Sequence, residues 1–138
     1  MVNSSSNQAS ELRSITALVR IYVAIILVTL VALVALSASA PRLATSDAWF
    51  HAVIISLCAV VLRLRLRAAR EGSKNALRAV GIIAAVLVAV NLAETLIPGL
   101  FPVWMRTEMV VIAALMAVVV TLAVRKRTRA RVLEQSQN

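Results

Sequence analysis

The chain has 138 residues, of which 61% are hydrophobic and only 15% are charged, and its formal net charge is +9 at pH 7. A typical soluble domain is about one half apolar and one quarter charged, so too few polar residues are present to cover a water-soluble fold. The composition also excludes intrinsic disorder, and the single cysteine, Cys58, excludes an intrachain disulfide framework. An integral membrane protein is the class that remains.

The first apolar run is expected to form a membrane-spanning helix over residues 16–40, after a mobile polar N-terminus at 1–10. Residues 21–36 carry no charge, and weakly polar neighbours extend the run to about 20 residues, enough to cross the roughly 30 Å apolar core of a bilayer. The run ends at Pro41. Its basic start and the small residues 38–40 also resemble a signal peptide, but the run is long for one, and Pro41 would follow the cut.

A second helix is expected over residues 47–70, with Thr45 at its N-cap. Its uncharged core, 49–62, is short, and arginine and leucine then alternate. A strand with open edges cannot lie in lipid, so the helix is expected to continue, with its arginines reaching the headgroups. Contacts with anionic lipid are predicted for these arginines and for the basic residues after the last apolar run: Arg63, Arg65, Arg67, Arg70, Arg125, Lys126 and Arg127.

The third and fourth helices are expected over residues 75–97 and 103–124, and a basic cytoplasmic tail follows at 125–138. Ser73 is the predicted N-cap of the third helix, and a Pro-Gly pair ends it. The four helices form one predicted transmembrane domain, residues 11–124. The expected fold class is therefore an all-α, polytopic membrane protein with four transmembrane helices.

The distribution of basic residues predicts how these helices are oriented. Thirteen of the fifteen Lys and Arg residues lie in the N-terminal segment, around the connection between the second and third helices, or after the fourth. Only Arg42 and Arg106 lie at the other two connections, where Trp49 and Trp104 also lie. The positive-inside rule and the aromatic belt both place the two termini in the cytoplasm, so the predicted location is the cell membrane, plasma or inner.

Small residues recur at every fourth position along the third helix: Gly81, Ala85, Ala89 and Ala93. Such a ridge lets another helix approach closely. The predicted partners on the fourth helix are Ala113, Ala117 and Thr121, or the ridge forms a subunit contact. Ala84 lies off the ridge, so leucine is expected to be tolerated better there than at Ala89.

Glu94 is the one carboxylate inside an apolar run, and Asn91 lies one helical turn deeper. Ionisable residues within membranes are rare and usually face a partner or a cavity, which makes Glu94 a candidate protonatable site. The alternative is a structural role near the outer interface, where Glu94 pairs with Arg106 or His51. The candidate proton or ligand site comprises residues of the outer helix ends: Glu94, Asn91, His51, Arg106, Glu108 and Asp47.

No set of residues points to catalysis. One histidine and one cysteine are too few for a haem pair, a structural zinc site or a thiol redox couple, and no phosphate loop or hydrolase motif occurs. We therefore expect no enzyme activity, no cofactor, no metal and no nucleic-acid partner.

Two functional hypotheses follow from these patterns. The first is a non-enzymatic accessory subunit or self-associating scaffold, whose partners are anionic membrane lipid, further copies of the chain or a larger membrane protein. The alternative is a small oligomeric proton-coupled transporter or exporter that uses Glu94.

The segment 77–106, with Leu96-Ile97-Pro98-Gly99-Leu100-Phe101-Pro102 and Trp104-Met105-Arg106, resembles small four-helix integral membrane proteins of high-GC bacteria. The resemblance covers most of the chain from the first to the fourth helix, and it implies the fold without implying an activity. In size the chain is also similar to small multidrug transporters, whose essential glutamate lies in the first helix. The first expected helix here has no acidic residue, so that function is not transferred.

Overall fold

The computed structural model describes residues 2–136, with side chains for residues 6, 7 and 9–136. Within that range every regular element is helical, and no strand occurs. The elements are α1 (Val2–Ser39), the short 3-10 helix η1 (Pro41–Leu43), α2 (Ser46–Arg70), α3 (Lys74–Thr95) and α4 (Val103–Gln135). The predicted all-α class is confirmed.

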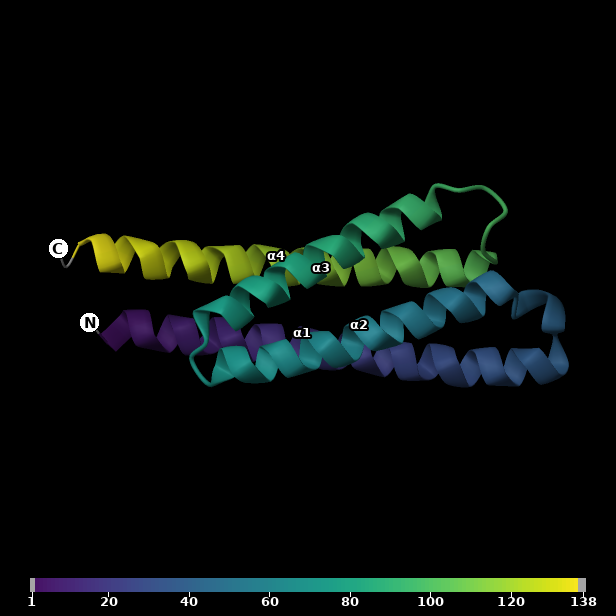
Figure 1. The fold of residues 1–138 in the computed structure, drawn as a ribbon, viewed down its shortest axis with the longest axis horizontal. Coiled ribbons are helices and arrows are strands. Elements are labelled where there is room, and N and C mark those ends of the chain that lie inside the picture. Colours follow the sequence, from purple (N-terminus) through teal and green to yellow (C-terminus); the bar gives the residue numbers. More distant parts are fainter. Residues whose placement is uncertain (1, 137–138) are drawn as a thin grey trace.

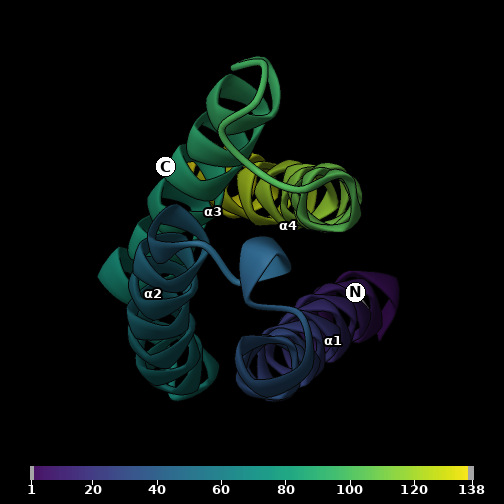
Figure 2. The same cartoon turned by 90° about the vertical axis from the view of Figure 1, so that its right-hand side faces the viewer.

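The four helices form a bundle in which each helix contacts its neighbours in sequence and α1 also contacts α4 (Figure 1). Seen along the bundle, the helices follow one another around a cycle (Figure 2). Both chain ends and the α2–α3 connection lie toward one end of the molecule, and the other two connections lie at the opposite end. Consecutive helices are therefore antiparallel, as short connections require.

The predicted caps and breaks set the ends of the central helices. The Thr45 hydroxyl accepts a hydrogen bond from the backbone N–H of Ala48, and the Ser73 hydroxyl accepts one from that of Ala76, each at 3.2 Å. These bonds satisfy N–H groups that the first turn of a helix leaves free. Gly72 follows α2 with φ +96°, a conformation that costs glycine little.

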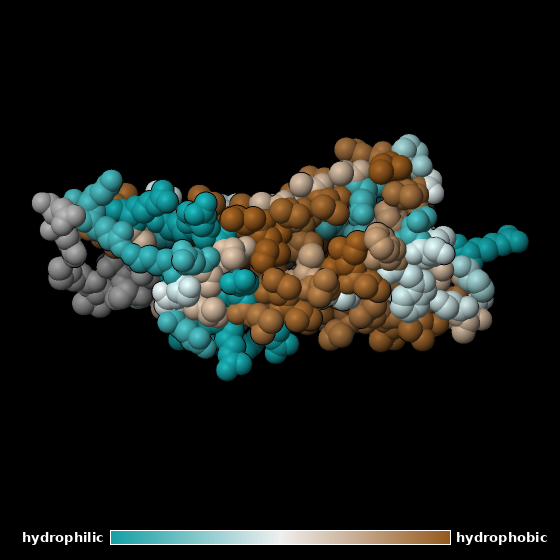
Figure 3. Space-filling view, in the orientation of Figure 1, coloured by the Kyte–Doolittle hydropathy of each residue, from teal (hydrophilic) through white to brown (hydrophobic). Residues whose placement is uncertain are grey.

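The outer surface of the bundle is apolar along its middle and polar toward its ends, on the face shown in Figure 3. Within the described part of the chain, three helices are long and apolar enough to cross a membrane: Ala9–Ser39 of α1, α3 and α4. α2 is not among them, and it carries four arginines in its C-terminal third. This composition is that of a small integral membrane protein.

The first and last helices, α1 and α4, are longer than predicted. α1 begins at Val2 instead of near residue 16, and α4 continues to Gln135 instead of ending near residue 124. Their polar ends lie at the same end of the bundle, where Arg129 pairs with Glu11 at 2.9 Å and Glu134 pairs with Lys74. An apolar run marks the span of a bilayer, whereas a helix continues until a residue breaks it, and residues 2–15 and 125–135 contain no Pro or Gly.

The face that α3 turns into the bundle is not the predicted ridge. Ala84, Leu87 and Asn91 are buried on α3, with exposed fractions of 0%, 3% and 0%. The three alanines of the ridge are exposed: Ala85, Ala89 and Ala93. Only Gly81 faces α4, where an added Cβ would lie 3.5 Å from the Cβ of Ala123.

The predicted packing of the ridge against the fourth helix is therefore wrong beyond Gly81. Of the expected partners, Ala113 is buried, whereas Ala117 and Thr121 are exposed. The predicted tolerance is also reversed, because Ala84 lies in the core and Ala89 on the surface. The core of α3 is filled by a mixture of large and small apolar side chains, and the small residues alone do not identify it.

Candidate functional site

His51 and Glu94 are in direct contact near the end of the bundle opposite the chain termini. The His51 Nδ1 atom of α2 lies 2.6 Å from the Glu94 Oε2 atom in the last turn of α3. The His51 side chain is 4% exposed and the Glu94 side chain 27%. The distance is that of an ion pair, but Oε2 has no hydrogen bond of good geometry among the described residues. The contact is an ion pair only when the imidazole of His51 is protonated.

The connection after α3 holds the imidazole in place. Phe101 lies in this connection, is 7% exposed, and meets the His51 ring edge to face at a centroid distance of 5.5 Å. An aromatic edge against an aromatic face is a favourable arrangement. The His51 ring is thus enclosed by α2, α3 and the α3–α4 connection, so one of its nitrogens is fixed toward Glu94.

Arg106 does not pair with Glu94. Its Nη2 atom donates a hydrogen bond of 2.7 Å to the backbone carbonyl of Thr95, at the end of α3 where carbonyls lack helical partners. A cation is favourable at that position because the helix dipole is negative there. Of the two predicted partners for Glu94, the structure has His51, and Arg106 instead joins the end of α3 to the start of α4.

Asn91 is a buried polar residue whose side-chain nitrogen has a hydrogen-bond partner among the described residues and whose side-chain oxygen has none. Its Nδ2 atom donates to the carbonyl of Leu87 at 2.7 Å, and its Oδ1 atom has no partner among the described residues. An unsatisfied buried acceptor costs about 1–3 kcal/mol. Asn91 lies on the bundle side of α3, one turn from Glu94, so this end of the bundle contains both a carboxylate and an uncompensated acceptor.

Glu108 forms a separate polar contact between α4 and α1. Its carboxylate is hydrogen-bonded to the hydroxyl of Thr29, which also lies 3.0 Å from the carbonyl of Ile25. The Thr29 hydroxyl is the donor in both contacts, so its single hydrogen is shared between the Glu108 carboxylate and the Ile25 carbonyl. Thr29 is 4% exposed, and it was not among the predicted site residues.

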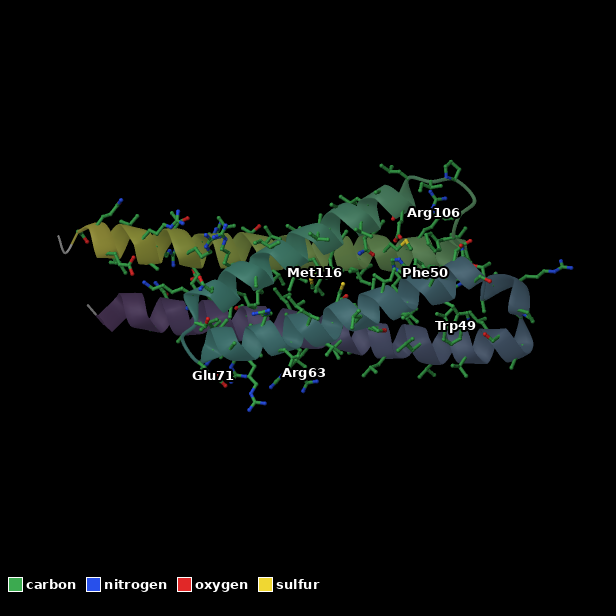
Figure 4. The ribbon with its side chains drawn as sticks, in the orientation of Figure 1. Trp49, Phe50, Arg63, Glu71, Arg106 and Met116 are labelled. Carbon is green, nitrogen blue, oxygen red and sulfur yellow. The ribbon has the colours of Figure 1, made fainter. Side chains whose placement is uncertain are left out.

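Asp47 stands apart from the other candidates. It is exposed in the first turn of α2, and no ion pair links it to another described residue. Figure 4 shows Arg106 near the same end of the molecule as Trp49 and Phe50. The six candidates thus divide into the His51–Glu94 pair with Asn91 nearby, the Glu108–Thr29 contact, and two residues, Arg106 and Asp47, that serve helix ends.

Tyr22 is a further buried polar residue that the sequence analysis missed. Its side chain is fully buried, and its hydroxyl donates a hydrogen bond of 3.0 Å to the carbonyl of Ile55 in α2. The signal available in the sequence is that Tyr22 is the only tyrosine and lies at the start of an apolar run. Together with the bond from Trp49 Nε1 to the Ser37 hydroxyl at 3.2 Å, it joins α1 to α2.

Between residues 2 and 136, no group of three or more His, Cys, Asp or Glu side chains is placed to hold a metal ion. Cys58 is a free thiol, half-buried within α2. What the described polar groups can do is donate, accept or hold a proton within an apolar bundle.

No family model matches this sequence, and neither a curated protein nor a solved structure is found to be similar to it. The resemblance to four-helix proteins of high-GC bacteria therefore stays a prediction.

Proposed function

We propose that the chain is an integral protein of the cell membrane that crosses it four times, with both termini in the cytoplasm. α2 needs a separate argument, because it is not among the three helices that are apolar enough to cross a membrane. Its outward face is nevertheless apolar: Phe50 and Leu57 are exposed by 71% and 65%. It runs antiparallel between α1 and α3, and its two connections lie at opposite ends of the bundle. If α1 and α3 cross a membrane, α2 crosses it as well. The excess of basic residues at the end with the termini supports the orientation.

Reporter fusions test this topology. Fusions after Asn138 and between Gly72 and Ser73 are expected to be active only as cytoplasmic reporters. Fusions near Thr45 and near Gly99 are expected to be active only as external reporters. An external C-terminus would contradict the proposal, because it requires an odd number of spans when the N-terminus is cytoplasmic.

Within that membrane, the role that we propose is a non-enzymatic one, as a self-associating scaffold or an accessory subunit. The observation that carries it is that the ridge of α3 is exposed: Ala85, Ala89 and Ala93 face away from the bundle. In lipid, small side chains allow a second helix to approach closely and to gain van der Waals contacts. Lipid alone requires no such ridge, so an exposed one favours contact with a second copy or a larger membrane protein.

Ala89→Leu is expected to shift the purified chain from oligomer to monomer, because the leucine side chain holds the neighbouring helix away. The measurement is the protein mass in detergent by light scattering over a range of protein concentrations. Ala114→Leu, at an exposed alanine of α4, is the matched control and is expected to leave the mass unchanged. A native chain that is monomeric throughout contradicts self-association, and co-purification with a larger membrane protein that depends on Ala89 would favour the accessory role.

A proton-coupled transporter is the second candidate, and the His51–Glu94 contact favours it. The two side chains, one from α2 and one from α3, are close enough to share a proton. The Glu94 side chain is also 27% exposed, so a proton can reach it from outside the bundle. Four helices are few to enclose a pathway, so this function requires an oligomer.

Proton flux in reconstituted vesicles tests the transporter. In vesicles that contain a pH-sensitive dye, the native chain should carry protons down a pH gradient, and Glu94→Gln should abolish the flux. Glu71→Gln, an exposed carboxylate after α2, is the control; equal flux in both variants contradicts the transporter.

A further inference from the structure

A basic groove lies between the halves of α1 and α2 that are nearer the chain termini. It has a volume of about 400 Å³, and four of its lining residues are arginines: Arg20 from α1, and Arg63, Arg67 and Arg70 from α2. A second cavity of about 420 Å³ adjoins it, shares Arg20 and Arg70, and adds Arg13. The two helices thus bring five arginines to one side of the bundle.

The positions of these arginines follow from helical geometry. Arg63, Arg67 and Arg70 are separated by four and three residues, so they lie on one face of α2. Arg20 comes just before the apolar run of α1, and the antiparallel packing of the two helices brings it beside them. Arg65 projects from another side of α2 and does not line the groove.

The positive charge of the groove is almost uncompensated. No carboxylate lines either cavity. Of the five arginines, only Arg67 has an ion pair with a described residue, at 3.6 Å from the exposed Glu71. The like charges of four guanidinium groups in one groove repel one another, and an anion bound between them relieves that repulsion. Arginine is well suited to bind phosphate because its planar group donates two parallel hydrogen bonds.

The groove is also amphipathic along its length. Val23 lies deeper in the apolar run than Arg20, and Val60 lies deeper than Arg63; both valines line the groove. Val60 and Leu64 are 56% and 61% exposed, so this wall continues onto the apolar outer surface. In Figure 4, Arg63 extends away from the bundle at this half of α2. A ligand with a phosphate at one end and hydrocarbon at the other matches both parts.

We propose that this groove binds one anionic phospholipid of the cytoplasmic leaflet. The phosphate lies between Arg20 and Arg63, with Arg67 and Arg70 toward the headgroup, and an acyl chain follows Val23 and Val60 toward the middle of the bilayer. Basic pockets between transmembrane helices on the cytoplasmic side are suited to such headgroups. The choice of leaflet rests on the proposed topology, whereas the binding of the lipid does not.

Native mass spectrometry of the full chain in detergent tests the site. Phosphatidylglycerol is titrated in and compared with phosphatidylcholine of the same acyl chains. Arg20→Gln and Arg63→Gln are each expected to weaken phosphatidylglycerol binding by about fivefold. Arg65→Gln, which removes the same charge from the same helix outside the groove, should weaken it less than twofold. All these arginines are exposed, and unchanged unfolding temperatures will show that the variants fold.

Three results would overturn the proposal. If Arg65→Gln weakens binding as much as Arg63→Gln, the attraction is that of a diffuse basic surface. If phosphatidylcholine binds equally, charge does not select the lipid. If millimolar inorganic phosphate displaces the lipid, the groove is a site for free phosphate. Because the measurement uses micelles, an external C-terminus in the fusion experiment would move the site to the other leaflet and leave this binding result unchanged.

Discussion

Ala84→Leu is expected to lower the free energy of unfolding by about 1–3 kcal/mol, the usual cost of extra methylene groups in a packed core. Ala84 has no exposed surface, and it lies in the cluster of buried apolar residues that includes Val80 of α3 and Ile112 of α4. The larger side chain must push α3 away from its neighbours or adopt a strained rotamer. The measurement is reversible unfolding of the purified chain in one detergent, followed by circular dichroism.

The control for this prediction is Ala114→Leu, in which the same atoms are added on the exposed side of α4. Substitutions at such surfaces usually change stability by less than about 0.5 kcal/mol. If the two variants unfold alike, Ala84 does not face a packed interior, and the placement of α3 in the bundle is wrong.

Glu94→Leu and His51→Leu are each expected to destabilise the chain by about 1–3 kcal/mol, because each leaves the other polar group partly buried without its partner. The double variant removes both groups. Its loss of stability should therefore be smaller than the sum of the two single losses, by about 1 kcal/mol or more. Unfolding of the four proteins in the same detergent measures this coupling.

Arg106 provides the comparison for this cycle. Its guanidinium group is bound to the Thr95 carbonyl, and not to Glu94, so the losses from Arg106→Leu and Glu94→Leu should add. Coupling between Arg106 and Glu94, with none between His51 and Glu94, would show that the end of the bundle opposite the chain termini is arranged differently. In that case the transporter candidate would lose the observation that favours it.

The class of fold and the bounds of the two central helices, α2 and α3, could be predicted from the sequence, to within two residues at each end. The excess of apolar residues required helices that satisfy their own backbone groups. Thr45 and Ser73 act as caps because their hydroxyls can replace a backbone acceptor, and Gly72 ends α2 with a positive φ. These are local effects, which depend on a few neighbouring residues and on little else.

Only the tertiary structure decided which face of each helix lies inside. In a soluble protein the polar face identifies the outside, but in lipid both faces of α3 are apolar, so Ala84 and Ala89 cannot be distinguished by type. Their places depend on how α3 packs against α2 and α4. The same holds for polar partners: Glu94 had two candidates, and the packing of α2 beside α3 brings His51 to 2.6 Å from it. Thr29 acquires its contact in the same way, because its partner Glu108 lies in α4, 79 residues away in the sequence.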